Sequence, residues 1–285
     1  MVDGTSESAL IDAFADFIAG VPTRAIETPF GRSSYWEMGE GEPLVLLHGI
    51  SGGRRLFFRT VPLLAQHYRV IVPALRGEDV PVRGCALDDL MGDIDALLTT
   101  LQLDAVTLYG ASFGGYLALA YAARNDPRVR AVVTQGAFTR FRLRPLDILS
   151  LYGSYAVPSR FGSSYYAWRV LKGRETGYLQ EFAPGIDQLN FGWQRATPFA
   201  SLRQRTHMIA GIDLSDRVRG IEVPVSIGHG RRDPVVPFAA FEQLRTLLPQ
   251  AAAEAWDAGG HMQMITHPEL FSGLAGTGLA RGAHK

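Results

Sequence analysis

The sequence predicts an α/β fold, in which a mainly parallel β-sheet is flanked by helices and carries one helical insertion. The first observation is a series of largely apolar runs, typical of strands buried on both faces: 43–47, 69–72, 105–109, 129–134, 223–227 and 251–256. The second is that segments of helical periodicity lie between them: 55–66, 86–101, 113–124, 238–248 and 267–275. Strands and helices that alternate in this way form a parallel sheet with helices on both faces. The third is a break in the alternation between residues 139 and 215, where we expect a helical cap inserted between two core strands.

Residues 1–22 precede the sheet and are predicted to form an amphipathic helix. Apolar side chains recur there at helical spacing: Leu10, Ile11, Phe14, Phe17, Ile18 and Val21. We expect the helix to pack on the main body, with a role in dimerisation or surface docking as the alternative, so a homodimer is kept open. The segment lacks the cationic start and apolar block of a secretory signal, and a cytoplasmic location is expected.

Residues 23–47 are predicted to form a β-meander. Two short strands, 24–28 and 33–38, are separated by a Pro-Phe-Gly turn. Residues 39–42 make a second turn, which leads into the buried strand at 43–47.

The predicted cap, residues 139–215, divides the core into residues 23–138 and 216–285. Aromatic residues are concentrated here, because 13 of the 29 in the chain lie within the 62 residues from Phe138 to Phe199. They are consistent with an apolar or aromatic substrate pocket, but a small cap also needs aromatic side chains for its own core, and we favour this second interpretation. A run of arginines could bind a substrate carboxylate, although a solvated face is the commoner role of such a run: Arg140, Arg142 and Arg144.

The composition excludes several classes of function. The 28 Lys and Arg residues balance the 28 Asp and Glu residues, so no overall field attracts nucleic acid or an anionic membrane. No run approaches the ~20 apolar residues of a membrane span. The one cysteine, Cys85, excludes an internal disulfide and a cysteine-based metal cluster, and its sequence surroundings offer no electropositive partner for a catalytic thiol. We expect a small-molecule substrate of apolar or aromatic character, with neither nucleic acid nor membrane as a partner.

The strongest chemical signal is Gly110-Ala111-Ser112-Phe113-Gly114-Gly115, which follows the strand at 105–109 and leads into a helix at 116–124. This is G-x-S-x-G in the strand–turn–helix context of a nucleophile elbow, where a sharp turn strains the backbone of the serine. Side chains in place of Gly110 and Gly114 would collide with neighbouring backbone in so tight a turn. Taken alone the pattern also fits a glycine-rich turn, but its position favours Ser112 as a nucleophile.

A serine hydroxyl needs a base to take its proton, so we expect a histidine close to Ser112. Of the seven histidines, His261 is the prediction, because it follows the last strand on a glycine loop, at the sheet edge where Ser112 lies. His229, at the end of the strand at 223–227, is expected to pack or to form a hydrogen bond. The remaining histidines are assigned to loops, surfaces or helix ends: His48, His67, His207, His267 and His284.

The base in turn needs an acceptor that fixes its tautomer and stabilises the imidazolium. Asp233 follows the strand at 223–227 and reaches the same edge, whereas residues 135–140, after the preceding strand, contain no carboxylate. An aspartate that only caps a helix before Pro234 is the alternative. We predict that Ser112, His261 and Asp233 form a catalytic triad.

Two backbone N–H groups are expected to form an oxyanion hole. One belongs to Phe113 at the helix N-terminus, and the other to Ile50 in the glycine-rich loop 48–53. The glycines of this loop also suggest phosphate binding, but no Gly-Lys-Ser/Thr follows and the G-x-G-x-x-G spacing is absent. We therefore reject a nucleotide site and expect chemistry that requires no metal and no organic cofactor.

With these motifs the chain resembles the α/β-hydrolase superfamily, specifically its capped esterases, haloperoxidase-like enzymes and carbon–carbon-bond hydrolases. The resemblance spans about residues 24–275, and four motifs in their family positions carry it: His48-Gly49, Gly110–Gly115, Gly230–Pro237 and Gly260-His261. It implies a sheet of the eight-stranded type, an inserted cap and a triad in the chain order Ser, Asp, His. These motifs are specific for the fold and the triad but not for the substrate.

One departure from the family follows the strand at 69–72. The family commonly has Asp-x-x-Gly-x-Gly-x-Ser there, and this chain has Pro73-Ala74-Leu75-Arg76-Gly77-Glu78-Asp79-Val80. Because this loop borders the pocket in the family, analogies about substrate are weakened. Serine rather than aspartate at position 112 disfavours the dehalogenase and epoxide-hydrolase branches.

The expected function is that of a serine hydrolase, which cleaves small or medium carboxylic esters through an acyl-enzyme. Hydrolysis of a carbon–carbon bond in a diketone-like ring-cleavage product is an alternative that the triad does not distinguish from ester cleavage. A ligand-binding sensor that retains the triad is a third hypothesis, which the complete set of catalytic residues disfavours.

Overall fold

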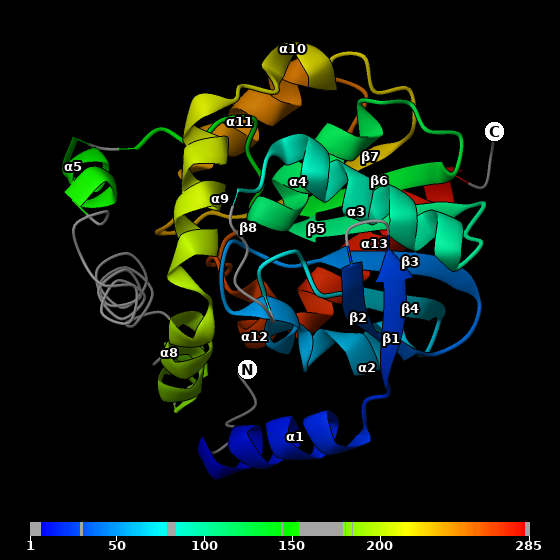
Figure 1. Ribbon diagram of the computed structural model, residues 1–285, viewed down its shortest axis with the longest axis vertical. Coiled ribbons are helices and arrows are strands. Elements are labelled where there is room, and N and C mark those ends of the chain that lie inside the picture. Colours follow the sequence, from blue (N-terminus) through cyan, green and yellow to red (C-terminus); the bar gives the residue numbers. More distant parts are fainter. Residues whose placement is uncertain are drawn as a thin grey trace.

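The computed structural model describes residues 7–28, 31–78, 84–143, 145–153, 179, 181–183 and 185–282. Its strands are β1 (Thr23–Thr28), β2 (Gly31–Met38), β3 (Glu42–Leu47), β4 (Tyr68–Pro73), β5 (Val106–Ala111), β6 (Val129–Gln135), β7 (Val225–Gly230) and β8 (Ala252–Trp256). They form one sheet in the order β1-β2-β4-β3-β5-β6-β7-β8 (Figure 1). The pairings of β1 with β2 and of β2 with β4 are antiparallel, and all others are parallel. The predicted α/β fold, with its mainly parallel sheet of the eight-stranded type, is confirmed.

The described helices flank this sheet or lie in the insertion. They are α1 (Glu7–Gly20), the 3-10 helix η1 (Gly53–Phe57), α2 (Thr60–Leu64), α3 (Leu87–Thr100), α4 (Phe113–Ala122), α5 (Pro145–Gly153), α8 (Ile186–Ala196), α9 (Phe199–Gly211), α10 (Ser215–Val218), α11 (Phe238–Leu247), α12 (Gln263–Thr266) and α13 (Pro268–Gly282). The helix predicted over 55–66 is divided into η1 and α2. Pro62 lies in the first turn of α2, where its missing N–H breaks no intrahelical bond, so a new helix begins at Thr60.

The predicted β-meander is wrong in its last step. β1 and β2 form the expected antiparallel hairpin, but β2 then pairs with β4, and β4 lies between β2 and β3. From Leu44 to Leu47 the side chains of β3 are completely buried. A strand with apolar side chains on both faces is stabilised most in the interior of a sheet, and β3 accordingly lies between two parallel neighbours, β4 and β5.

The alternation of side chains along β3 divides the core between the two faces of the sheet. Val45 and Leu47 belong to the core that also contains residues of α3, α4 and α11. Leu44 and Leu46 belong to the opposite core, with residues of α2, α12 and α13. Because Cβ atoms point alternately to the two faces of a strand, one continuous apolar run fills both layers.

Helices α5, α8, α9 and α10 lie between β6 and β7, in the stretch predicted to be a cap. Residues 154–178, together with 144, 180 and 184, belong to the same stretch and lie outside the described residues. The aromatic side chains at its borders are buried and pack on neighbouring elements, as Phe138 does on Tyr116 and Trp193 on Phe58. This packing supports the structural interpretation of the aromatic residues. The exact division into core and cap stays a prediction.

Both described arginines of the run before α5 are exposed. Arg140 donates a hydrogen bond to the backbone oxygen of Ala210 at 3.2 Å, and Arg142 is exposed. Arg144 lies outside the described residues. The arrangement favours the interpretation of this run as a solvated face.

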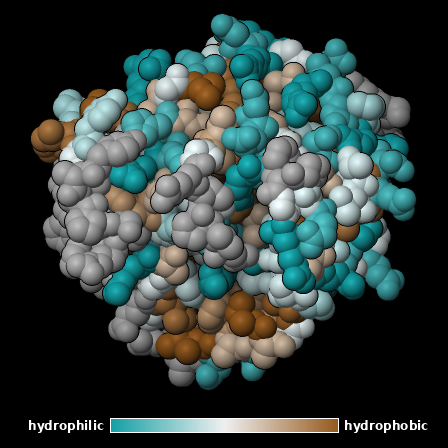
Figure 2. All heavy atoms as spheres, in the orientation of Figure 1, coloured by the Kyte–Doolittle hydropathy of each residue, from teal (hydrophilic) through white to brown (hydrophobic). Residues whose placement is uncertain are grey.

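Helix α1 lies within the N-terminal segment that is predicted to be amphipathic. Leu10 and Phe17 are buried, whereas Ile11 and Ile18 are 38% and 39% exposed. The ring centroid of Phe14 lies 4.6 Å from that of Trp193 in α8, so the helix packs on the main body. Figure 2 shows hydrophobic surface at the lower end of the molecule, where α1 lies, and at the side that carries α5. The large apolar side chains exposed in these two helices are Ile11, Ile18, Leu146, Ile148, Leu149 and Tyr152.

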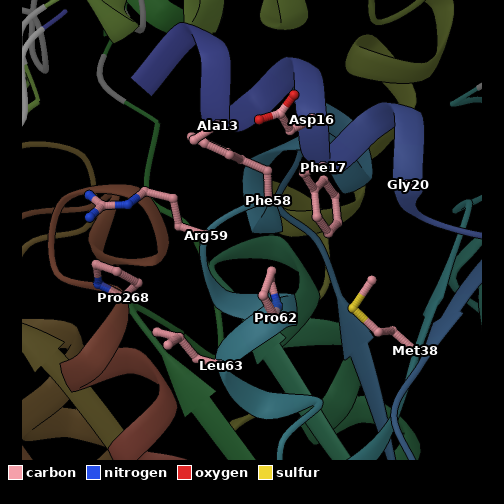
Figure 3. Close-up of a pocket in the computed structure, with 10 residues that line it drawn as sticks. All are labelled: Ala13, Asp16, Phe17, Gly20, Met38, Phe58, Arg59, Pro62, Leu63 and Pro268. Carbon is pink, nitrogen blue, oxygen red and sulfur yellow. The ribbon is translucent and has the colours of Figure 1, made fainter. Parts of the chain in front are cut away.

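A pocket of about 520 Å³ lies beside α1, between this helix and α2 (Figure 3). Its lining is Ala13, Asp16, Phe17, Gly20, Met38, Phe58, Arg59, Pro62, Leu63 and Pro268. The predicted triad residues are not among them, so this pocket is separate from the candidate site. None of the helices in the described ranges combines the length and the apolar character that crossing a bilayer requires.

Candidate active site

Ser112 occupies the single position between the end of β5 and the start of α4. Its backbone has φ 55° and ψ −114°, a conformation that costs a non-glycine residue about 1–3 kcal/mol. The surrounding structure holds this strain, since the N–H of Ser112 donates to the oxygen of Gln135 at 2.8 Å. In addition, the N–H of Tyr116 donates to the oxygen of Ser112 at 3.0 Å. The geometry is that of the predicted elbow.

The two glycines that flank the serine are required by close backbone approach. A Cβ atom at Gly110 would lie 2.1 Å from the backbone oxygen of Gly114, and a Cβ at Gly114 would lie 1.9 Å from the oxygen of Leu47. Real Cβ contacts at such distances do not occur, so any other residue would force the strand and the helix apart. The predicted collision at both positions is confirmed.

Asp233 and His261 are in direct contact. Nδ1 of His261 lies 2.7 Å from Oδ2 of Asp233, and the aspartate side chain is fully buried. The other carboxylate oxygen, Oδ1, accepts the backbone N–H groups of Val235 and Val236, both at 2.8 Å. The two functions considered for Asp233, orienting a histidine and capping the turn, therefore belong to different oxygens of one side chain. Oδ1 stabilises the turn after β7, and this fixes Oδ2 against the imidazole.

Ser112 and the aspartate–histidine pair lie at the same edge of the sheet, where β5, β7 and β8 end and β6 lies between β5 and β7. The end of β6 touches both parts: the Gln135 oxygen accepts from Ser112, and Nε2 of Gln135 donates to the backbone oxygen of His261 at 3.4 Å. At the next residue, Gly136, a Cβ atom would lie only 3.5 Å from Nδ1 of His261. Ser112 is 8% and His261 is 7% exposed, so both belong to a largely enclosed site.

His229 lies directly behind the aspartate, as a packed histidine. Its Nε2 is 3.1 Å from the backbone oxygen of Val236 and 3.9 Å from Oδ2 of Asp233. Burial lowers the pKa of His229, and the nearby Asp233 only partly opposes this effect. The ring thus supports the turn that carries Asp233, in agreement with the packing and hydrogen-bonding role expected from the sequence.

The loop after β3 approaches Ser112 from the other side. A Cβ atom at Gly49 would lie 3.9 Å from Cβ of Ser112, which makes this loop the neighbour of the serine. Among the described residues, no hydrogen bond takes up the backbone N–H of Ile50 or that of Phe113. Further along the loop, Gly52 and Gly53 have φ values of 81° and 67°, the left-handed region that favours glycine. That the N–H groups of Ile50 and Phe113 form an oxyanion hole stays a prediction.

Charged side chains that the sequence analysis missed lie behind this loop. Oε1 of Glu78 accepts hydrogen bonds from the backbone N–H and from Nε of Arg54, both at 3.2 Å. Oε2 of Glu78 lies 2.7 Å from Nε2 of His48. Burial alone would raise the pKa of Glu78, but the His48 ring and the Arg54 guanidinium outweigh it and hold this pKa at about 2. A third basic residue, Arg205 of α9, is completely buried nearby.

Other reactive groups are poorly placed for catalysis or metal binding. Burial raises the pKa of the Cys85 thiol to about 11, so it is a thiol rather than a thiolate near neutral pH. Within the described part of the chain, no three His, Cys, Asp or Glu side chains are grouped as metal ligands. The assignment of Ser112, His261 and Asp233 as a catalytic triad stays a prediction.

Comparison with known proteins gives the family to which this fold belongs. Residues 42–208 match the family model described as alpha/beta hydrolase fold, so the chain belongs to the α/β-hydrolase family. The fold also matches a solved enol-lactonase from Burkholderia xenovorans, with a TM-score of 0.81, 21% identity and coverage of 90% of this chain and 100% of that one.

Two curated relatives carry different activities. The chain is 32% identical to 2-hydroxy-6-oxo-2,4-heptadienoate hydrolase from Pseudomonas putida, over 86% of this chain and 91% of that protein. It is 30% identical to pimeloyl-[acyl-carrier protein] methyl ester esterase from Aromatoleum aromaticum, over 79% and 93% of the two chains. The family thus includes both an esterase and a dienoate hydrolase at similar distance from this protein.

Proposed function

We propose that this protein is a serine hydrolase that cleaves a small or medium carboxylic ester through an acyl-enzyme intermediate, with Ser112 as nucleophile. The observation that carries the proposal is the contact of 2.7 Å between His261 and Asp233, at the sheet edge where the backbone of Ser112 is held in its strained turn. A buried carboxylate that fixes an imidazole beside a serine is the arrangement that activates a hydroxyl for attack.

The hydrogen bonds define the path of the proton in this mechanism. With Nδ1–H of His261 donated to Asp233, Nε2 is left to accept the proton of Ser112 as its Oγ attacks the ester carbonyl. The negative charge that forms on the carbonyl oxygen is stabilised by the N–H groups of Ile50 and Phe113. The C–O bond then breaks, and the alcohol leaves with the proton from His261. Water attacks the acyl-enzyme by the same route and releases the acid.

The inserted helices are proposed to cap this site, as the sequence suggests. Their contacts with the loop after β3 support the proposal, since the N–H of Gly52 donates to Oγ1 of Thr197 at 3.0 Å. Ser51 also donates to the side chain of Gln194 in α8. A cap that excludes water strengthens every electrostatic interaction inside the site.

Cleavage of a carbon–carbon bond in a diketone-like product of ring cleavage is the second candidate. The observation that favours it is the 32% identity with 2-hydroxy-6-oxo-2,4-heptadienoate hydrolase. The same serine, histidine and oxyanion hole would serve both reactions, and the side chains of the insertion would decide between them.

Labelling with a fluorophosphonate tests the nucleophile. We expect stoichiometric labelling of the wild type and none of Ser112→Ala, whereas Ser33→Ala, a change on β2 outside the site, should label like the wild type. Labelling that persists in Ser112→Ala would refute the assignment. A wild type that resists labelling although it is folded would support the sensor hypothesis instead.

Turnover of p-nitrophenyl esters of increasing chain length tests the reaction class. Fast turnover with a clear optimum of chain length is expected for an esterase, and the optimum measures the size of the acyl pocket. Slow ester turnover together with rapid loss of absorbance of a vinylogous diketone would transfer the assignment to carbon–carbon cleavage.

A further inference from the structure

The loop His48–Arg54, which carries Ile50, is held at both ends by one carboxylate. Glu78 contacts His48 at the start of the loop and the backbone N–H of Arg54 at its end. The carboxylate also fills the space beside Gly53, where a Cβ atom would lie 2.6 Å from Oε1. Glu78 therefore determines the separation of the two ends of the loop that lies next to Ser112.

The middle of the same loop is held by Arg205 from the inserted helix α9. Its Nη1 donates to the backbone oxygen of Ile50 at 2.8 Å, and its Nη2 donates to the backbone oxygen of Arg76 at 2.9 Å. The guanidinium lies over the ring of Phe113, with Cζ 5.6 Å from the ring centroid. One side chain of the insertion thus joins the loop after β3, the loop after β4 and the first residue of α4.

Because Arg205 and Glu78 are buried, their interactions restrict the conformation of the loop next to Ser112. Arg205 is 1% exposed, and burial lowers its pKa to about 10 while Glu78 partly opposes this effect, so the guanidinium stays charged at neutral pH. A buried charge that loses its partners is strongly destabilised, whereas an exposed one turns to water. The loop consequently has little freedom to change the direction of its N–H groups.

We propose that Arg205 and Glu78 are positioning residues, which together hold the loop so that the Ile50 N–H points at the developing oxyanion. The inference rests on the proposed function, because it assigns to them an effect on the transition state of ester cleavage. Neither side chain touches the substrate in this proposal. The proposal also gives the insertion a second task besides covering the site, since α9 takes part in forming the oxyanion hole.

If the two residues position the loop, their substitution should lower kcat and leave KM nearly unchanged. Loss of one oxyanion donor lowers kcat by about 10²- to 10³-fold, and a donor that is misdirected rather than lost should cost less. We expect Arg205→Met to lower kcat about 10- to 100-fold with KM changed less than about twofold. Lysine can keep the charge and reach one of the two carbonyl oxygens, so Arg205→Lys should recover part of the loss.

Inhibition by a trifluoromethyl ketone distinguishes positioning of the oxyanion hole from a merely structural role, which would leave the inhibition constant unchanged. The ketone adds to the serine and places an oxyanion in the hole, so its inhibition constant should rise in Arg205→Met by the same factor by which kcat/KM falls. Glu78→Gln should change both quantities in the same direction, and the double variant should lose less than the product of the two single losses, since both residues hold one loop. Arg195→Met, at an exposed position of α8, is the matched control and should behave like the wild type.

Several outcomes would overturn the inference. A folded Arg205→Met with unchanged kcat would do so, as would an effect confined to KM or an unchanged inhibition constant of the ketone. If Arg205→Met fails to fold, the same comparison is made with Arg205→Lys and Glu78→Gln, and wild-type values in both would refute it. A wild type that neither turns over esters nor is labelled would instead overturn the proposed function, and this inference with it.

Discussion

Glu78 offers a test of the buried charges that is independent of catalysis. Its pKa is held at about 2, against an ordinary value of 4.5, by the His48 ring and the Arg54 guanidinium acting against burial. At about 1.4 kcal/mol per pKa unit, the difference is worth about 3 kcal/mol of folding free energy. Because the pKa is lower in the folded state, this stability is fully present above pH 4.5 and is lost as the pH falls from about 4.5 to about 2.

The perturbation is Glu78→Gln, which keeps the shape of the side chain but does not titrate. We expect the variant to be less stable than the wild type at pH 7 and the two stabilities to converge as the pH falls toward 2. The measurement is the free energy of unfolding in urea at a series of pH values between 7 and 2.5. Charged groups that do not contact Glu78 are the same in both proteins, so the difference between the two curves reports on Glu78 together with its contacts to His48 and Arg54. Glu42→Gln, at an exposed position, should give a curve parallel to that of the wild type.

Curves for the wild type and Glu78→Gln that stay parallel from pH 7 to 2.5 would refute this reasoning. They would mean that the carboxylate of Glu78 has the same proton affinity in the folded and unfolded chains. The contacts of Glu78 with His48 and Arg54 would then have no role in stability, and the argument that Glu78 holds the loop firmly would lose its physical basis.

Further predictions concern the triad and the elbow. In Asp233→Asn we expect the amide oxygen to keep its hydrogen bonds with the two backbone N–H groups of the turn, so the NH₂ group would face His261 and favour the wrong tautomer. In an ester assay kcat should fall by about 10⁴-fold. The control Asp257→Asn, at an exposed position, should have the kcat of the wild type. Gly114→Ala should leave little folded protein by circular dichroism, since its methyl group would lie 1.9 Å from a backbone oxygen of β3. Gly273→Ala, in α13 with open space around it, should instead raise the free energy of unfolding by about 0.5–1 kcal/mol, measured in urea.

Much of the architecture could be predicted, because it depends on patterns of residues that are close together in the sequence. Buried strands appear as apolar runs, and helices as apolar positions three and four residues apart, so the elements and their alternation follow from neighbours in the chain. The position of β4 between β2 and β3 did not follow, because strand pairing joins residues that are distant in sequence. The local pattern of residues 23–47 favoured a meander, and the stability of a buried central β3 overrode it.

The candidate site divides in the same way. Ser112, Asp233 and His261 could be proposed from the sequence, because each follows a strand in a loop with a characteristic composition and the ends of parallel strands meet at one edge. The tertiary structure alone gives the 2.7 Å contact of Asp233 with His261 and the division of labour between the two oxygens of the aspartate.

Glu78, Arg54 and Arg205 had no comparable signal. A single charged residue in a loop or on a helix is indistinguishable from a solvated one until its partners are known, and those of Arg205 lie 155 and 129 positions away in the chain. Local periodicity and turn chemistry encode most of the elements, the elbow and the three triad candidates, so these could be predicted from the amino-acid sequence. Only the tertiary structure shows which charges are buried against the loop that carries Ile50. Packing brings together side chains that no local pattern relates.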